Sequence, residues 1–224
     1  MRAAIFDLDG TLADTAADLV AAANAVAAAQ GWPALDPQAE RAVAGRGSRA
    51  LLRRAMARAG MAEDLALVEA LVPAFLDDYA GRIADRSRLY PGAVACLDSL
   101  AADGWRLGVC TNKPVGLART LLTALGVADR FAAVLGADSL PVRKPDPRHL
   151  FETLARVGGR PERAVLIGDT ATDRETARRA GVPCILMRHG YAEGPLAALA
   201  ADAEADGLAE VPMLAGSLLA RAAS

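Results

Sequence analysis

The sequence predicts an α/β fold in which a parallel sheet, with helices on both faces, is interrupted near its start by an inserted helical domain. From about residue 90 onward, short apolar runs alternate with helical patterns, as in strand–helix–strand units. The runs are continuous, which is typical of strands buried on both faces. Residues 16–86 show helical patterns and no convincing strand. We therefore expect a core domain of residues 1–14 and 87–224, and a helical cap domain of residues 15–86.

The core elements are expected in a regular order. The first strand lies at residues 3–6, at the start of the stretch AIFDLDGTLADT. The other expected strands lie at 106–111, 131–136, 164–169 and 183–188. The expected helices around them lie at 92–102, 114–125, 147–157 and 172–180. Because strands and helices alternate, the strands should run parallel in one sheet.

The inserted domain is rich in alanine, which favours helix. Its expected helices lie at 15–30, 38–44, 48–59 and 63–83. Ser48 is placed to cap the third of them. The chain should return to the core near Pro91 and Gly92, which break the helical pattern and start a new helix.

The composition excludes several classes of protein. The 224 residues are 53% apolar and 23% charged, which is enough for a full hydrophobic core. The formal net charge of −2 does not suggest a partner such as nucleic acid or a membrane surface. We expect no signal peptide, since the first strand begins at once. The protein should be cytoplasmic, and the sequence leaves open whether it is a monomer or a homodimer. The three cysteines are Cys96, Cys110 and Cys184. We expect them to be buried free thiols in a protein of a reducing compartment.

Polar residues follow three of the expected strands at the point where each ends. Asp7 ends the first, Thr111 and Asn112 end the next, and Asp169 ends the strand at 164–169. In α/β sheets, ligands bind beyond the carboxyl ends of the strands. Each residue alone would be explained as a turn former or a helix cap. Their shared placement at strand ends instead predicts one common site.

The acidic residues predict a metal. Asp7 and Asp9 are two positions apart in extended chain, so their side chains point to the same side. Two close carboxylates repel, and one takes up a proton unless a cation lies between them. Asp169 is expected nearby as a third acid. Oxygen ligands of this kind favour Mg²⁺, held by Asp7, Asp9 and Asp169, with Asp9 contributing its backbone carbonyl.

Other residues would bind a phosphoryl group. Lys144 lies in the stretch VRKPDP, where Pro145 fixes the loop, although a surface role for Lys144 or its neighbour Arg143 is the alternative. A helix beginning after Asn112 would favour an anion at its N-terminus. The expected phosphate-binding residues are Gly10, Thr11, Thr111, Asn112 and Lys144.

Together these groups are the parts of phosphoryl transfer through an aspartyl phosphate. Asp7 would attack phosphorus, and Asp9 would protonate the leaving oxygen and then activate water. Thr111 and Lys144 would stabilise charge on the phosphoryl group. Thr11, after the Gly10 turn, would hydrogen-bond Asp9 or the nucleophile.

Four stretches resemble the motifs of the haloacid dehalogenase superfamily. They are DLDGTLADT, the pair TN at 111–112, Lys144 in RKPDP, and GDTATD at 168–173. The resemblance covers nearly the whole chain and implies a Rossmann-like core with an inserted helical cap, Mg²⁺ as cofactor and an aspartyl-phosphate intermediate. It places Asp173 where it would hold metal-bound waters. An aspartate at position 9 is what phosphatases and phosphomutases of the superfamily carry, so dehalogenation is disfavoured.

The substrate should be a small phosphorylated metabolite chosen by the cap. Gly45, Arg46 and Gly47 could bind a carboxylate of the substrate, although an ordinary helix–helix turn explains them equally well. The stretches GRGSRALLRRA, LYPG, LGVCTNKP and RKPDP resemble superfamily members that hydrolyse 2-phosphoglycolate. Related members act on sugar phosphates, nucleotides or pyrophosphate.

Two other functions stay open at this stage. A phosphomutase of the β-phosphoglucomutase type would use the same acids but pass the phosphoryl group to a sugar. A non-catalytic phosphate-binding or partner protein could share the fold, but it would have no need of Asp9.

Overall fold

The computed structural model describes residues 1–222, which form two compact units. The first, here called the core unit, comprises Met1–Ala13 and the chain from Leu89 onward. The second, here called the helical unit, is Asp14–Arg88. The chain passes between them through two short paired strands, β2 (Ala13–Asp14) and β3 (Arg88–Leu89).

The core unit is built on a six-stranded sheet with the strand order β5-β4-β1-β6-β7-β8. All neighbouring strands of this sheet are parallel, which confirms the predicted α/β fold. The strands are β1 (Arg2–Phe6), β4 (Trp105–Cys110), β5 (Ala133–Leu135), β6 (Ala164–Gly168), β7 (Cys184–Met187) and β8 (Ala203–Ala205). The three-residue edge strand β8, Ala-Glu-Ala, was not expected from the sequence, because a run so short and so weakly apolar does not signal a strand.

Strand β1 lies at the centre of the sheet between β4 and β6. Phe6 is in register with Val109 on one side and with Ile167 on the other. The amide of Asp7 donates to the carbonyl of Ile167 over 2.8 Å and so continues the pairing by one residue. The residues that follow these three strands therefore meet at one edge of the sheet, as the sequence predicted.

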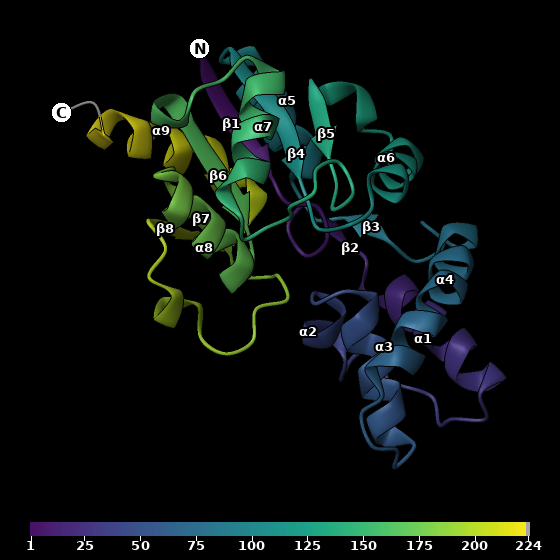
Figure 1. Ribbon diagram of the computed structural model, residues 1–224. Helices are drawn as coiled ribbons and strands as arrows, with labels where there is room; N and C mark the ends of the chain where they lie inside the picture. Colours follow the sequence, from purple (N-terminus) through teal and green to yellow (C-terminus); the bar gives the residue numbers. More distant parts are fainter. Residues whose placement is uncertain (223–224) are drawn as a thin grey trace. The chain divides into compact units, whose positions relative to one another are not determined.

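Helices cover both faces of the sheet (Figure 1). Helices α7 and α8 pack together on one face, and α5 and α9 pack together on the other. The core on the α7–α8 face includes Ile5, Leu150, Leu154, Leu166 and Leu186. The helices are α5 (Ala93–Ala102), α6 (Val115–Ala124), α7 (Pro147–Val157), α8 (Ala171–Ala180) and α9 (Val211–Ala222). Helix α9 was not expected from the sequence.

Four short 3₁₀ turns complete the connections of the core unit within the described residues. They are Ala128–Arg130, Pro161–Arg163, Leu196–Leu199 and Leu208–Glu210.

The helical unit contains α1 (Ala16–Ala29), α2 (Arg41–Ala44), α3 (Ser48–Arg58) and α4 (Leu65–Gly81). Helix α1 packs against both α3 and α4. The prediction that Ser48 caps α3 is wrong: Ser48 is the first residue of the helix, and Gly47 is the cap. Gly47 has φ 83°, which glycine adopts without strain, so the turn into the helix occurs one residue earlier than the serine indicated.

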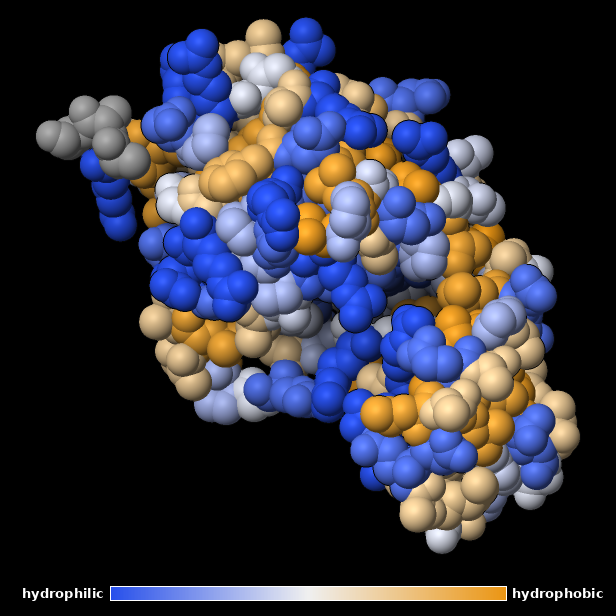
Figure 2. All heavy atoms as spheres, viewed as in Figure 1, coloured by the Kyte–Doolittle hydropathy of each residue, from blue (hydrophilic) through white to orange (hydrophobic). Residues whose placement is uncertain are grey.

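The surface carries hydrophilic and hydrophobic residues side by side, and the two kinds are interspersed on the face seen in Figure 2. All three cysteines are buried free thiols. Within residues 1–222, no helix combines the length and the apolar character that a membrane span requires.

Candidate active site

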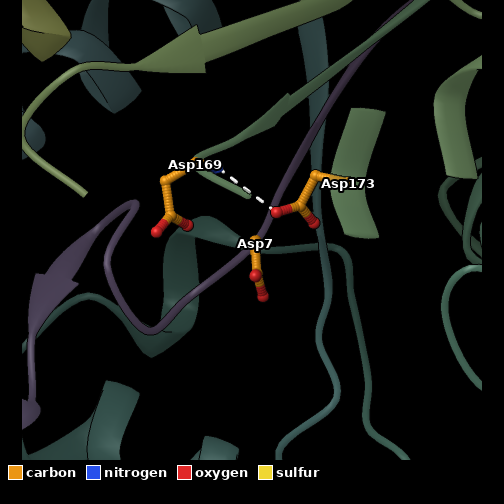
Figure 3. A group of neighbouring side chains, drawn as sticks. All are labelled: Asp7, Asp169 and Asp173. Carbon is orange, nitrogen blue, oxygen red and sulfur yellow. Dashed lines mark hydrogen bonds between the residues drawn. The ribbon is translucent and has the colours of Figure 1, made fainter. Parts of the chain in front are cut away.

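Three carboxylates meet at the carboxyl edge of the core sheet. Asp7 follows β1, Asp169 follows β6, and Asp173 lies in the first turn of α8 (Figure 3). One oxygen from each lies within 4.8 Å of the others, and Asp169 and Asp173 are fully buried. We call these three residues the acidic cluster. It unites the two acids that the sequence placed on separate strands, Asp7 and Asp169.

The start of α8 holds Asp173 in place. Thr170 is the N-cap of the helix, and its side chain and that of Asp173 form a reciprocal capping box. One carboxylate oxygen of Asp173 accepts the Thr170 hydroxyl over 2.7 Å and the amides of Thr170 and Asp169 over 3.1 and 3.2 Å. Ordinary capping chemistry therefore fixes this side chain beside Asp169.

Asp169 is held by two segments that are far from it in the sequence. The Thr11 hydroxyl donates to one carboxylate oxygen over 2.7 Å, and the Tyr191 amide donates to the other over 2.7 Å. Gly10, with φ 83°, brings this turn so close that a side chain there would overlap the Asp169 carboxylate. The expectation that Thr11 bonds Asp9 or the nucleophile is therefore wrong, because the Gly10 turn directs its hydroxyl to Asp169. Tyr191 was missed, since its contribution is a backbone amide that carries no side-chain signal.

Lys144 lies among the acids. Only 3% exposed, it places its Nζ 3.0 Å from Asp7 Oδ2 and 2.6 Å from Asp173 Oδ1. The alternative that Lys144 is a surface charge is therefore wrong, whereas its neighbour Arg143 is exposed. The side-chain amide nitrogen of Asn112 donates to the Lys144 carbonyl over 3.0 Å and so connects the loop after β4 to the loop that carries Lys144.

Asp9 forms an ion pair with Lys113, which was not expected to be part of the site. The Nζ of Lys113 lies 3.0 and 3.2 Å from the two carboxylate oxygens of Asp9. Within the described residues the acidic cluster does not include the Asp9 carboxylate. Lys113 follows Thr111 and Asn112 directly in the stretch TNKP. That position could have marked it, but a lone lysine is usually a surface charge.

Thr111 is buried at the end of β4, where its amide donates to the Leu135 carbonyl over 3.1 Å. Its hydroxyl oxygen accepts the Lys113 amide over 3.2 Å. The hydroxyl therefore helps to shape the loop that carries Lys113.

The acidic cluster carries more negative charge than its single lysine can balance. Burial raises the pKa of Asp7 to about 6, against the opposing effect of Lys144. Burial and the charges of Asp173 and Asp7 raise the pKa of Asp169 well above its ordinary value. Burial also acts on Asp173, but the charge and hydrogen bond of Lys144 lower its pKa. A divalent cation would relieve this excess charge, and the all-oxygen donor set fits a hard one.

Magnesium is expected to stabilise the protein more at about pH 8 than at about pH 5. Asp7 has an ordinary pKa of 3.8 and a folded pKa of about 6. Between these values the folded protein keeps a proton that the unfolded chain has released, so metal-free stability falls as the pH rises through this window. Above it, Mg²⁺ bound to the ionised carboxylate would offset this loss of stability.

Thermal melts in EDTA and in MgCl₂ at both pH values measure this effect. We expect the gain in Tm at the higher pH to be larger by several degrees, since 1 kcal/mol is worth about 2–4 °C for a chain of this size. Equal gains at the two pH values would show that protons and metal do not compete at this cluster.

The candidate substrate contacts of the helical unit lie in its α2–α3 turn. Gly45 and Arg46 are exposed, and Gly47 caps α3. Arg46 lines a cavity of about 410 Å³ together with Glu40, Arg53 and Arg54. Glu40 is buried and accepts a hydrogen bond from Arg54 over 2.8 Å.

The chain belongs to the haloacid dehalogenase-like hydrolase family, whose model matches residues 4–187. The fold and the acidic edge of its sheet are therefore those of a hydrolase. Among its relatives, a phosphoglycolate phosphatase from Caulobacter vibrioides is 46% identical over 96% of this chain and 90% of the relative. A phosphoglycolate phosphatase from Rhodospirillum rubrum is 43% identical over 94% of this chain and 89% of the relative.

Solved structures of other proteins share the fold of this chain. A predicted phosphoglycolate phosphatase from Haemophilus somnus has a TM-score of 0.87 at 28% identity, covering 96% of this chain and 97% of its own. CbbY from Rhodobacter sphaeroides, solved in complex with xylulose-(1,5)bisphosphate, has a TM-score of 0.77 at 26% identity, covering 94% of this chain and 96% of its own.

Proposed function

We propose that this chain is a Mg²⁺-dependent phosphatase that hydrolyses 2-phosphoglycolate to glycolate and phosphate through an aspartyl phosphate on Asp7. The observation that carries the proposal is the acidic cluster with Lys144 at the carboxyl edge of the sheet. The relatives named phosphoglycolate phosphatase support the choice of substrate.

Asp7 is suited to act as the nucleophile. The Leu8 amide donates to its Oδ1 over 2.7 Å, and Lys144 lies at its Oδ2. These two contacts orient the carboxylate. Attack on phosphorus requires the ionised form, which the pKa of about 6 makes the main form at neutral pH. Lys144 and Thr111 would then stabilise charge on the phosphoryl oxygens.

Asp9 would transfer the protons. It would protonate the leaving oxygen of the substrate and later remove a proton from the water that hydrolyses the intermediate. Its ion pair with Lys113 holds the carboxylate beside the end of β4. The proton cycle is closed, since the proton taken from water replaces the one given to glycolate.

The metal would be held by Asp7, Asp169 and the backbone carbonyl of Asp9, with Asp173 binding its waters. When bound, Mg²⁺ would supply positive charge against the transferring phosphoryl group. Thr11 and the Tyr191 amide fix the Asp169 carboxylate that would bind it.

The helical unit would act as the cap that selects the substrate. We propose Gly45, Arg46 and Gly47 as the contacts for the carboxylate of phosphoglycolate. Gly10 and Asn112 are also proposed to face the phosphate. The buried free thiols fit a reducing compartment, and we propose the cytoplasm.

A sugar bisphosphate is the second candidate substrate. CbbY from Rhodobacter sphaeroides, a structural neighbour, was solved with xylulose-(1,5)bisphosphate. A larger substrate of this kind would be selected by the same cap, and the chemistry at Asp7 would be unchanged.

Phosphate release from purified protein tests the proposal. We expect 2-phosphoglycolate to be hydrolysed in MgCl₂ with a higher kcat/KM than xylulose bisphosphate, glucose 1-phosphate, nucleotides and pyrophosphate. EDTA should stop the reaction, and added Mg²⁺ should restore it. Isomerisation of glucose 1-phosphate without phosphate release would favour a mutase. Binding of phosphate esters without turnover of any would rule out an enzyme.

A further inference from the structure

His149 lies fully buried in the first turn of α7, the helix that follows the loop carrying Lys144. Its Nδ1 lies 3.4 Å from the Sγ of Cys110, and its Nε2 lies 3.0 Å from the carbonyl oxygen of Gly136. The imidazole therefore joins three elements: α7, the end of β4 and the residue that follows β5. No step of the proposed mechanism uses it.

The partners decide which nitrogen carries the proton. A carbonyl oxygen can only accept, so the proton lies on Nε2 and is donated to Gly136. Nδ1 is then an acceptor, and the Cys110 thiol donates to it. Burial and the nearby charge of Lys144 lower the pKa of His149, which agrees with a neutral ring. The two hydrogen bonds therefore run in one direction: Cys110 donates to His149, and His149 donates to Gly136.

Both ends of this pair of hydrogen bonds border the loop that carries Thr111 and Lys113. Cys110 is the residue before Thr111. Gly136 packs so closely on the loop that a side chain there would overlap the Lys113 carbonyl and the Val115 amide. The next amide, that of Ala137, donates to the same Lys113 carbonyl over 3.0 Å. A shift of Gly136 would therefore move Lys113, the ion-pair partner of Asp9.

We propose that His149 is a positioning residue for the reaction. By donating Nε2–H to Gly136 it holds the loop of Thr111 and Lys113 against the end of β5. Through Lys113 it places the Asp9 carboxylate, and through Cys110 it steadies the start of the loop. This inference rests on the proposed function, because its kinetic test needs turnover.

A matched pair of variants tests the inference. The side-chain amide nitrogen of glutamine can reach the place of Nε2, whereas the shorter asparagine reaches only the place of Nδ1. We expect His149→Gln to keep kcat on 2-phosphoglycolate within about threefold of wild type. We expect His149→Asn to lower kcat roughly 10- to 100-fold with little change in KM, as for a misplaced reacting group.

Cys110→Ser completes the set, since a hydroxyl still donates to Nδ1, and should behave as wild type. Equal losses in the Gln and Asn variants, both folded by their thermal melts, would overturn the inference. Wild type that turns over no phosphate ester would instead overturn the proposed function. The nitrogen NMR shifts of His149 in the wild-type protein provide a test without activity: we expect the neutral Nε2–H tautomer, and the Nδ1–H tautomer or an imidazolium would contradict this pair of hydrogen bonds.

Discussion

Replacing Asp7 with asparagine is expected to reduce phosphate release from 2-phosphoglycolate by roughly 10⁴-fold or more, the scale seen when a covalent nucleophile is removed. An amide of the same shape cannot form the aspartyl phosphate. The loss should appear in kcat. Measuring kcat at saturating Mg²⁺ separates a loss of the chemical step from a weaker binding of the metal.

The same variant should remain folded. Asp7 is partly buried and its folded pKa of about 6 shows that its charge is disfavoured there. Removing that charge is expected to leave the metal-free Tm unchanged or to raise it. Asp103→Asn is the matched control, because Asp103 is exposed and it is its backbone carbonyl, which the substitution keeps, that accepts the hydrogen bond from Arg2. Turnover at the wild-type rate in Asp7→Asn would show that the nucleophile is another group.

Replacing Lys144 with methionine is expected to reduce both activity and stability. The buried Nζ contacts Asp7 and Asp173, so its loss removes the cationic partner of both carboxylates. Breaking a buried ion pair in this way costs about 3–5 kcal/mol. We expect kcat to fall about 10²- to 10³-fold, as when one group that stabilises the transition state is removed. Urea unfolding in EDTA measures the stability, and single-turnover kinetics measures the chemistry.

Arg143→Met is the matched control for Lys144→Met, since it removes a charge from the adjacent exposed residue. It should leave both measurements within error of wild type. The double variant Lys144→Met/Asp173→Asn should recover part of the lost stability, because it also removes an unpaired charge, but none of the activity. If Lys144→Met is as stable and as active as Arg143→Met, the lysine is not part of the site.

The residues that would do the chemistry could be found from the sequence because they occupy positions that local structure defines. Asp7, Thr111 and Asp169 each follow an apolar run, and parallel strands bring their carboxyl ends to one edge. The register of β1 with β4 and β6 then places them together. A hydrophobic run and the residue that ends it are adjacent in the chain, so no tertiary information is needed to see them.

The partners of Asp9 and Asp169 were decided only by the tertiary structure. Lys113 was found beside Asp9, the Thr11 hydroxyl beside Asp169, and a backbone amide of the β7–β8 connection beside the same carboxylate. His149 likewise connects Cys110 with Gly136 across two strands. These contacts join residues that are 13 to 158 positions apart in the chain. Apolar periodicity reports which face of an element is buried, whereas the geometry of a polar contact depends on how the whole sheet brings its loops together.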